Sequence, residues 1–212
     1  SDGATVSSKK DNLVNIGGFL AVRDPELARR ARAMLVAFEG LHTYGGMSGR
    51  DMEALAQGIR EMVATDDHVR SRVGQVEYLG EALVKYGVPV VTPIGGHGVF
   101  LDAAAILEHL PQEHFPAQAL AAGIYVDSGV RGMERGIVSA GRNPQTGQHH
   151  VPRLELVRLT IPRRVYTQSH MDVVAESVIE VYENAETIQG LEFTYEPEEL
   201  RFFQARFAPI GA

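Results

Sequence analysis

The chain carries, at residues 7–18, the stretch Ser7-Ser8-Lys9-Lys10-Asp11-Asn12-Leu13-Val14-Asn15-Ile16-Gly17-Gly18, in which a lysine pair follows two hydroxyls and a glycine pair closes an apolar segment. A lysine amine can form a Schiff base with an aldehyde cofactor when its surroundings favour the neutral amine. The alternative is a lysine pair on a solvated surface, which is common in proteins. Residues 13–20 are typical of a buried strand interrupted by glycines, and this setting favours a site for a phosphate and a covalent cofactor.

The composition is that of a soluble α/β protein. The sequence has 212 residues, of which 44% are hydrophobic and 22% charged, enough for a core in one or two domains. The net charge is -7 and the basic residues are scattered, so we expect no nucleic-acid partner. There is no cysteine, no apolar run of membrane-spanning length and no leader, so we expect a cytoplasmic protein without membrane insertion. Because the chain starts without methionine, shortly before the candidate lysine, we expect a fragment.

Turn signals and hydrophobic periodicity predict an α/β fold. Asp24-Pro25 is typical of a helix start, and Gly87-Val88-Pro89 of a helix end. We expect a domain boundary or a helix bend near 65–67, and the absence of a parallel-barrel rhythm indicates part of one sheet plus a small α/β domain. The expected helices are 26–38, one from about 50, 69–83, 102–107, 117–125 and 171–185, and the expected strands are 13–20, 88–91, 99–101, 154–161, 190–196 and 201–207.

Two arginines and an aromatic pair stand out among the remaining residues. Arg158 lies inside an apolar strand pattern, where its planar guanidinium needs a carboxylate, either of a structural acid or of a substrate. Arg135 either pairs with the adjacent Glu134 or another acid, or serves a ligand. Phe202-Phe203 is typical of core residues in an edge strand. We expect no transition metal, because no histidine or carboxylate has zinc-ligand spacing, and no serine nucleophile, because the Gly-x-Ser-x-Gly motif is missing.

Along its whole length the chain resembles the carboxyl-terminal half of the β-eliminating lyases that use pyridoxal 5′-phosphate. The likeness is carried by Lys9-Lys10, by Met133-Glu134-Arg135-Gly136 and by Phe202-Phe203. The resemblance implies the α/β fold of the pyridoxal phosphate-dependent transferases, aspartate aminotransferase fold type I. Residues 1–63 would be the remnant of the large cofactor-binding domain, and residues 64–212 the small carboxyl-terminal domain.

The same resemblance implies a cofactor site around the lysine pair. Lys10 would carry pyridoxal 5′-phosphate as an aldimine. Since successive side chains of an extended segment point to opposite sides, Lys9 would instead support the cofactor phosphate, as would Ser7, which matches the family's phosphate-binding serine. Tyr44 matches an active-site tyrosine that reaches across a subunit boundary. Asn15 matches the residue whose backbone carbonyl helps to bind an activating potassium ion.

Two positions discriminate between members of the family. Members that cleave tyrosine carry arginine at the position of Arg135 and two phenylalanines at those of Phe202 and Phe203. Members that cleave tryptophan have an aliphatic residue and a histidine instead of the arginine and the first phenylalanine. The resemblance therefore implies a carbon–carbon lyase that eliminates phenol from L-tyrosine, leaving pyruvate and ammonia. Arg135 would stabilise the keto form of the ring, Phe202, Phe203 and Met133 would wall it, and Arg158 would bind the α-carboxylate.

Several groups that the family needs have no counterpart in this sequence. The acid under the pyridine nitrogen, the aromatic that stacks on the cofactor, part of the phosphate cup and the tyrosine that protonates the leaving group come from the family's amino-terminal half. We therefore expect that half as a partner, in a homotetramer built from dimers. The alternatives are another β-eliminating lyase, such as one acting on tryptophan, and a noncatalytic assembly fragment that contributes subunit contacts alone.

Overall fold

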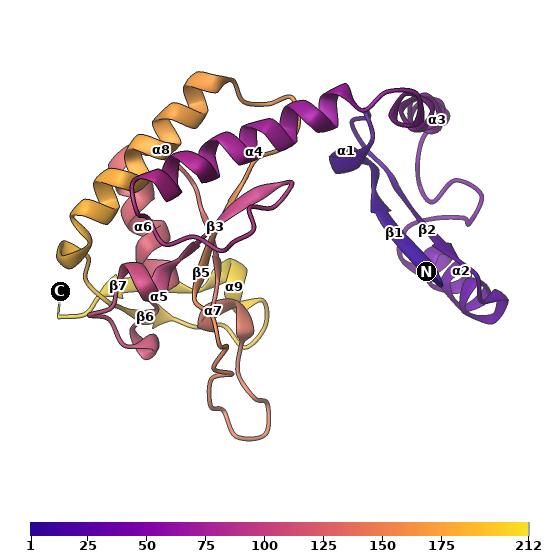
Figure 1. Ribbon diagram of the computed structural model, residues 1–212. Helices are drawn as coiled ribbons and strands as arrows, with labels where there is room; N and C mark the ends of the chain where they lie inside the picture. The colour runs from indigo at the N-terminus through magenta and orange to yellow at the C-terminus, as the bar shows by residue number, and fades with distance from the viewer. Residues whose placement is uncertain (212) are drawn as a thin grey trace. The chain divides into compact units, whose positions relative to one another are not determined.

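The structure is a computed structural model that describes residues 1–211. Its contacts divide the chain into two compact units, Ser1–Val69 and Arg70–Ala212, which are described separately below (Figure 1). Within residues 1–211, none of the helices has the length and apolarity that a membrane crossing requires.

A short antiparallel hairpin opens the first unit. Strand β1 (Gly3–Ser7) pairs with β2 (Gly18–Val22), and the register places Ser7 opposite Gly18. The connection between the two strands contains the one-turn helix α1 (Ser8–Asp11). The unit continues with two longer helices, α2 (Pro25–Phe38) and α3 (Gly49–Ala64). The predicted start of α2 is confirmed, because the carboxylate of Asp24 accepts hydrogen bonds from the first backbone N–H groups of the helix.

The predicted strand over residues 13–20 is wrong. The chain bends through residues 12–17, and only Gly18–Val22 is a strand, with most of its side chains exposed. Gly17 has a φ of 108°, which a side chain would disfavour, and its carbonyl accepts a hydrogen bond from Ser8 N at 2.9 Å. The glycine pair therefore closes a compact loop around α1 and does not interrupt a continuous strand.

The first unit has no buried hydrophobic side chain within residues 1–69. Its buried residues are Ser8, Asn12 and Gly58. Large apolar side chains of its helices are exposed instead, including Phe38 at 75% and Val63 at 85%. A surface of this kind is typical of a region that packs against further protein.

The second unit is built around a three-stranded antiparallel sheet in the order β3-β5-β4, formed by Gly98–Asp102, Leu156–Thr160 and Met133–Arg135. Alternate residues point to opposite faces of a sheet. One face is buried in the core and includes Leu101 and Val157, which are both fully buried. The opposite face is only partly covered, and it is the face that carries both arginines singled out in the sequence.

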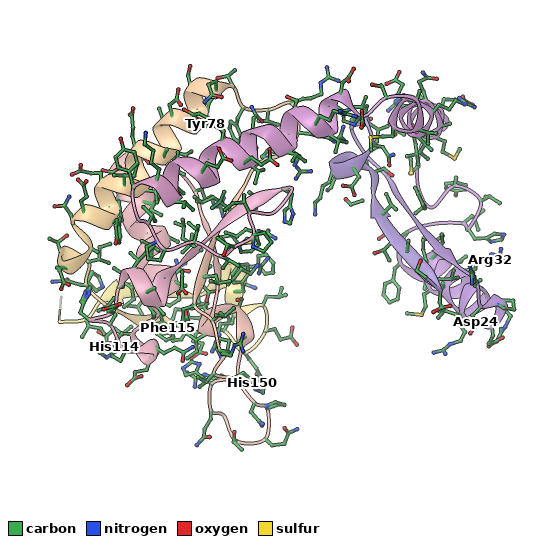
Figure 2. All side chains as sticks on the ribbon, in the orientation of Figure 1. Asp24, Arg32, Tyr78, His114, Phe115 and His150 are labelled. Carbon is green, nitrogen blue, oxygen red and sulfur yellow. The ribbon has the colours of Figure 1, made fainter. Side chains whose placement is uncertain are left out.

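Helices cover the buried face of this sheet. The two longest, α4 (Asp67–Lys85) and α8 (Gln168–Glu183), lie side by side (Figure 1). Tyr78 of α4, which is labelled in Figure 2, donates a hydrogen bond to the carboxylate of Asp172 in α8 at 2.6 Å. The other elements are α5 (Ala103–Ile106), the 3-10 turn Gln112–His114, α6 (Pro116–Ser128), α7 (Ile137–Ala140), the 3-10 turn Ala185–Thr187, β6 (Leu191–Tyr195), α9 (Arg201–Gln204) and β7 (Arg206–Pro209).

Most predicted elements of the second unit are confirmed, and two are not. The expected strand 88–91 is reduced to a single bridge between Val90 and Leu101, since the prolines on either side supply no N–H for a ladder. The expected strand 201–207 is wrong, because Arg201–Gln204 is helical and only Arg206–Pro209 is extended. Phe202-Phe203 therefore lies on a helical turn and not in an edge strand.

Candidate active site

The lysine pair lies on the one-turn helix α1, directly after β1, and both lysines are exposed. The expectation that Lys9 and Lys10 belong to an extended segment is wrong, because Asn12 N donates to Ser8 O at 2.8 Å and closes a helical turn. Successive residues of a helix are about 100° apart around the axis, so the two side chains still diverge. A division of tasks between the two lysines is compatible with this geometry.

Two polar groups beside the lysines have unused hydrogen-bonding capacity. Ser7 is the N-cap residue of α1, but its hydroxyl makes no capping hydrogen bond. Asn12, at the other end of α1, is 7% exposed, and its Oδ1 atom has no hydrogen-bond partner within residues 1–211. A buried polar atom without a partner is unusual in a folded protein. The lysine turn thus presents amines, a hydroxyl and an amide oxygen, a set that fits an aldehyde cofactor with a phosphate group.

Helix α3 supports the loop that follows the lysine turn. A Cβ atom at Gly58 would lie 2.6 Å from Val14 Cγ1, so glycine allows α3 to approach the loop closely. Asn15 lies in this loop and is exposed, while Tyr44 lies in the turn after α2 and is 40% exposed. The loop therefore has a fixed support, while Asn15 and Tyr44 remain accessible.

In the second unit, the partly covered face of the sheet brings two guanidinium groups together. Arg158 lies on the central strand β5, directly opposite Met133 of β4, and its Nη2 atom donates to Met133 Sδ at 2.9 Å. Arg135 is two positions beyond Met133, hence on the same face. The Nε atom of Arg158 is buried and has no hydrogen-bond partner in the described chain. This face of the sheet therefore concentrates positive charge.

Neither arginine is neutralised by an acid within residues 1–211. Glu134, the neighbour of Arg135, points to the opposite face and accepts hydrogen bonds from the backbone N–H groups of Val138 and Ser139. Burial lowers the pKa of Arg158, and the charge of Arg135 lowers it further. Both effects disfavour the charged guanidinium, so a bound carboxylate would find a site whose positive charge is not yet compensated.

The aromatic pair lies next to the same arginine. The Cζ atom of Arg135 is 5.2 Å from the centroid of the Phe202 ring, and the rings of Phe202 and Phe203 meet at 80° with 5.1 Å between centroids. A cavity of about 500 Å³ lies beside this pair. Met133 and residues of α6 line it together with both phenylalanines, whereas Arg135 and Arg158 do not. The five candidate residues of the second unit are thus linked by pairwise contacts, and three of them line the cavity.

Two acids are buried near Arg135: Glu134 lies in the same strand, β4, and Glu155 directly precedes β5. Glu134 and Glu155 are 3% and 2% exposed, and Glu155 accepts hydrogen bonds from Ile137 N and Gln112 Nε2, both at 2.8 Å. Burial raises the pKa of each carboxyl, and the charge of Glu134 raises that of Glu155 further. Glu155 was not predicted as a buried residue, because an acid between Leu154 and Leu156 has the alternation typical of a solvent-facing side chain.

Arg201 was likewise not among the predicted residues, although it is buried beside the aromatic pair. Its side chain contacts α7, and it directly precedes Phe202 in the chain. No pattern in the sequence indicated its burial, because the run 201–207 was predicted as a strand. Leu200 has a φ of 56°, a backbone conformation that is uncommon for leucine, so the residue type does not predict the turn at this position.

Comparisons with known proteins identify the family to which the chain belongs. A family model described as beta-eliminating lyase matches residues 1–177. A tyrosine phenol-lyase of Symbiobacterium sp. (strain SC-1) is 66% identical over 210 residues, which make up 99% of this chain and 46% of that protein. The corresponding proteins of Nostoc punctiforme and Clostridium tetani are 63% and 61% identical over 207 residues, covering 98% of this chain and 44% and 45% of theirs. The chain therefore spans about half the length of these curated relatives.

Solved structures show the fold. A serine palmitoyltransferase of S. paucimobilis with a bound PLP-myriocin aldimine matches with a TM-score of 0.56 at 16% identity, covering 88% of this chain and 41% of that one. A structure of SPT with its PLP internal aldimine matches with a TM-score of 0.54 at 17% identity, with the same coverage. The predicted α/β fold of the type I pyridoxal phosphate-dependent enzymes is thereby confirmed.

Proposed function

The chain belongs to the β-eliminating lyase family, and from this premise we propose that it is the carboxyl-terminal portion of a carbon–carbon lyase that eliminates phenol from L-tyrosine. The observation that carries the proposal is the pair Arg135 and Arg158 on one sheet face, without acidic partners in the described chain and with Phe202 packed on Arg135. In the complete reaction, one tyrosine and one water give one phenol, one pyruvate and one ammonia.

Pyridoxal 5′-phosphate is the cofactor that the lysine turn fits. The Lys10 amine would hold its aldehyde carbon, and the Ser7 hydroxyl and the Lys9 ammonium would hold its phosphate. When bound, the cofactor supplies an electron sink for negative charge at the substrate Cα. The Lys10 amine would also accept the Cα proton as a general base.

The second unit would bind the two ends of the substrate. Arg158 is suited to the α-carboxylate, because a carboxylate is a stronger acceptor than the Met133 sulfur that it contacts here, and because the buried Nε atom needs a partner. Arg135 is suited to the ring oxygen, where a cation stabilises the keto form through which phenol departs. Met133, Phe202 and Phe203 would enclose the ring and exclude water from it.

For the complete protein, we further propose a domain organisation, an assembly and two additional ligand contacts. Residues 1–63 would be part of its large cofactor domain and 64–212 its small domain, in a cytoplasmic homotetramer. The amino-terminal half would cover the apolar surface of the first unit, which the exposure of side chains such as Phe38 and Val63 supports. Tyr44 would act in a neighbouring subunit's site, and the backbone carbonyl of Asn15 would bind a potassium ion.

The first experiment measures the products of the complete protein loaded with pyridoxal phosphate. With L-tyrosine, we expect equal amounts of phenol, pyruvate and ammonia, determined by chromatography and enzymatic assay. L-tryptophan in a parallel reaction should give little indole. Faster release of indole than of phenol would instead select the tryptophan-cleaving alternative, and no product from either amino acid would favour the noncatalytic one.

A second experiment tests the arginine at the substrate carboxylate. Arg158→Met should raise the KM for tyrosine by about 100-fold, since a charge-assisted hydrogen bond contributes roughly 1.5–3 kcal/mol. Arg206→Met is the matched control, because Arg206 is exposed on β7, and it should leave KM unchanged. An unchanged KM in Arg158→Met would remove Arg158 from the site.

The cofactor lysine has a test that does not depend on activity. After borohydride reduction of the loaded protein, peptide mapping should locate the cofactor adduct on Lys10. Lys9→Ala should retain that adduct and bind the cofactor more weakly, whereas Lys10→Ala should abolish it. An adduct on Lys9 would reverse the proposed division between the two lysines.

A further inference from the structure

Arg201 is a buried charge whose N–H groups are extensively bonded. It is 7% exposed, and its Nη1 atom donates to Glu196 Oε1 at 2.8 Å and to His149 Nδ1 at 2.9 Å. Its Nε atom donates to the carbonyl oxygen of Val138 at 3.0 Å, and its Nη2 atom donates to that of Ile137. A buried guanidinium is tolerated when its charge and its donors are compensated in this way. The side chain is therefore a structural connector and not a vacant ligand site.

The connector joins the two segments that carry the candidate ring site. Ile137 is the first residue of α7, two positions after Arg135 at the end of β4. Arg201 itself is the first residue of α9, immediately before Phe202. Because the bonds to α7 are made to backbone carbonyls, they fix the path of one chain segment relative to the other. Beside this junction, the Cζ atom of Arg135 lies 5.2 Å from the centroid of the Phe202 ring.

Buried acids fix the other polar groups of α7. Glu134 accepts hydrogen bonds from Val138 N at 3.1 Å and Ser139 N at 3.0 Å, and Glu155 accepts one from Ile137 N. The first three N–H groups of α7 are thus bound to acids, while two of its carbonyls are bound to Arg201. A movement of Arg201 would therefore change the position of α9 against a short helix that is otherwise held.

Glu196 fixes the orientation of the Arg201 guanidinium. Its carboxylate also accepts two hydrogen bonds from Arg142, each 2.7 Å long. The hydrogen bond from Arg142, and after it that from Arg201, lower the pKa of Glu196 to about 2 despite its partial burial. The acid is consequently charged at neutral pH, and Arg201 keeps its ion pair throughout the range in which an enzyme of this type would work.

Resting on the proposed function, we propose that Arg201 is a positioning residue of the leaving-group site. It does not touch the substrate. It seats Phe202 against Arg135, so that the ring of the substrate meets both the aromatic wall and the cation in one geometry. Its loss should impair expulsion of an aromatic ring, since a misplacement of about 1 Å can lower a rate about 100-fold. Arg158 donates to the Met133 sulfur, which is not a partner of Arg201, so its function should be retained, as should that of the lysine turn.

The test compares two amino acids in the complete, cofactor-loaded protein. L-Tyrosine needs the ring site, whereas β-chloro-L-alanine loses chloride and needs no ring protonation. Arg201→Lys keeps the charge but lacks the planar fork that serves two carbonyls and an acid at once. We expect its kcat/KM for tyrosine to fall about 10- to 100-fold and that for β-chloroalanine to change by less than about twofold.

A binding measurement separates positioning from a general loss of structure. 3-(4-Hydroxyphenyl)propanoate carries the ring and the carboxylate but no amine, so it should inhibit β-chloroalanine turnover by occupying the site. Its inhibition constant should rise about tenfold in Arg201→Lys, as expected for the loss of roughly 1.4 kcal/mol of ring contacts. Arg206→Lys, on the exposed part of β7, is the matched control and should leave all three parameters unchanged.

The outcomes distinguish the inference from the function on which it rests. If the parent protein releases phenol but Arg201→Lys behaves like it, or loses both substrates equally, the role of Arg201 is refuted and the proposed function stands. If the parent protein releases no phenol from tyrosine, both are refuted. Should Arg201→Lys fail to fold, Glu196→Gln replaces it, because the amide weakens the orientation of Arg201 and should give the same selective loss to a smaller extent.

Discussion

The guanidinium of Arg135 lies over the ring of Phe202, with 5.2 Å between Arg135 Cζ and the ring centroid. The two residues come from β4 and α9, which are distant in sequence. Within residues 1–211 Arg135 makes no ion pair, so the aromatic ring is its principal partner. The contact orients a cation without neutralising it, so that under the proposed function the charge would be available to an oxyanion that develops on the substrate ring.

Phe202→Leu should weaken that orientation while keeping an apolar wall. A cation–π contact at a partly exposed position contributes about 0.5–1 kcal/mol, so kcat/KM for tyrosine should fall about two- to fivefold. Steady-state kinetics of the complete protein measure the change. Phe203→Leu, which removes a ring without a cation above it, should have a smaller effect. A larger effect at Phe203 would show that ring shape matters more than the cation contact.

Leu101→Ala should destabilise the second unit by about 3 kcal/mol, because the side chain is fully buried in the sheet and its removal leaves a cavity. Urea unfolding followed by circular dichroism gives the free energy of unfolding. Leu154→Ala is the matched control, since Leu154 is 43% exposed, and its effect should remain below about 1 kcal/mol. Equal losses in the two variants would contradict the assignment of the core.

Glu196→Gln should lower stability by about 1–2 kcal/mol at neutral pH, a value reduced for solvent screening because the Arg142 side chain is 39% exposed. The pKa of Glu196 is lowered from its ordinary 4.5 to about 2 in the folded chain. Its contribution is therefore complete above pH 4.5 and disappears as the pH falls toward 2. Unfolding free energies measured from pH 7 downward should converge for the variant and the parent chain.

The control for this pH series is Glu198→Gln, a change at an exposed acid of the same segment. It should shift the free energy of unfolding by less than about 0.5 kcal/mol at every pH. A difference between Glu196→Gln and the parent chain that persists unchanged below pH 2 would show that the effect comes from packing and not from charge.

Glu155→Gln should have the opposite pH dependence. Burial, aided by the charge of Glu134, raises the Glu155 pKa in the folded chain, so the parent chain loses stability as the pH rises through that pKa. The glutamine keeps an acceptor oxygen for Ile137 N and is always neutral. We expect the variant to match the parent chain in acid and to exceed it by about 1 kcal/mol near pH 8.

The same urea titrations at several pH values test this expectation. Glu113→Gln, at an exposed acid, should show no comparable rise of stability with pH. Lower stability of Glu155→Gln across the whole range would mean that the charged carboxylate, through its bonds to Ile137 N and Gln112, stabilises the folded chain.

Much of the fold was predictable because its signals are local. The Asp24-Pro25 start of α2 depends on a side chain that bonds its own helix, and Asp102 caps α5 in the same manner. The period of apolar residues also identified α4 from residue 69 onward. Each of these predictions rests on interactions between residues a few positions apart, and the structure confirms them.

The errors lie where distant residues decide the local structure. Arg201–Gln204 is helical because its first side chain reaches the carbonyls of α7, a contact that no short window of sequence contains. The strand predicted over 13–20 failed because Gly17 turns the chain back onto Ser8. The roles of the candidate residues of the second unit were taken from resemblance, and the shared sheet face of Met133, Arg135 and Arg158 follows from the pairing of β4 with β5.

The hold of Arg201 on α7 passes through main-chain oxygens and therefore makes no demand on the side chains at 137 and 138. The backbone that supports the proposed leaving-group site and the side chains that line this site can therefore change independently in evolution. Under the proposed function, substitutions at Met133, Arg135 or Phe202 would change which leaving group is accepted, while the scaffold beneath them persists. In protein engineering, those three positions are the ones to vary, and Arg201 is the residue to keep.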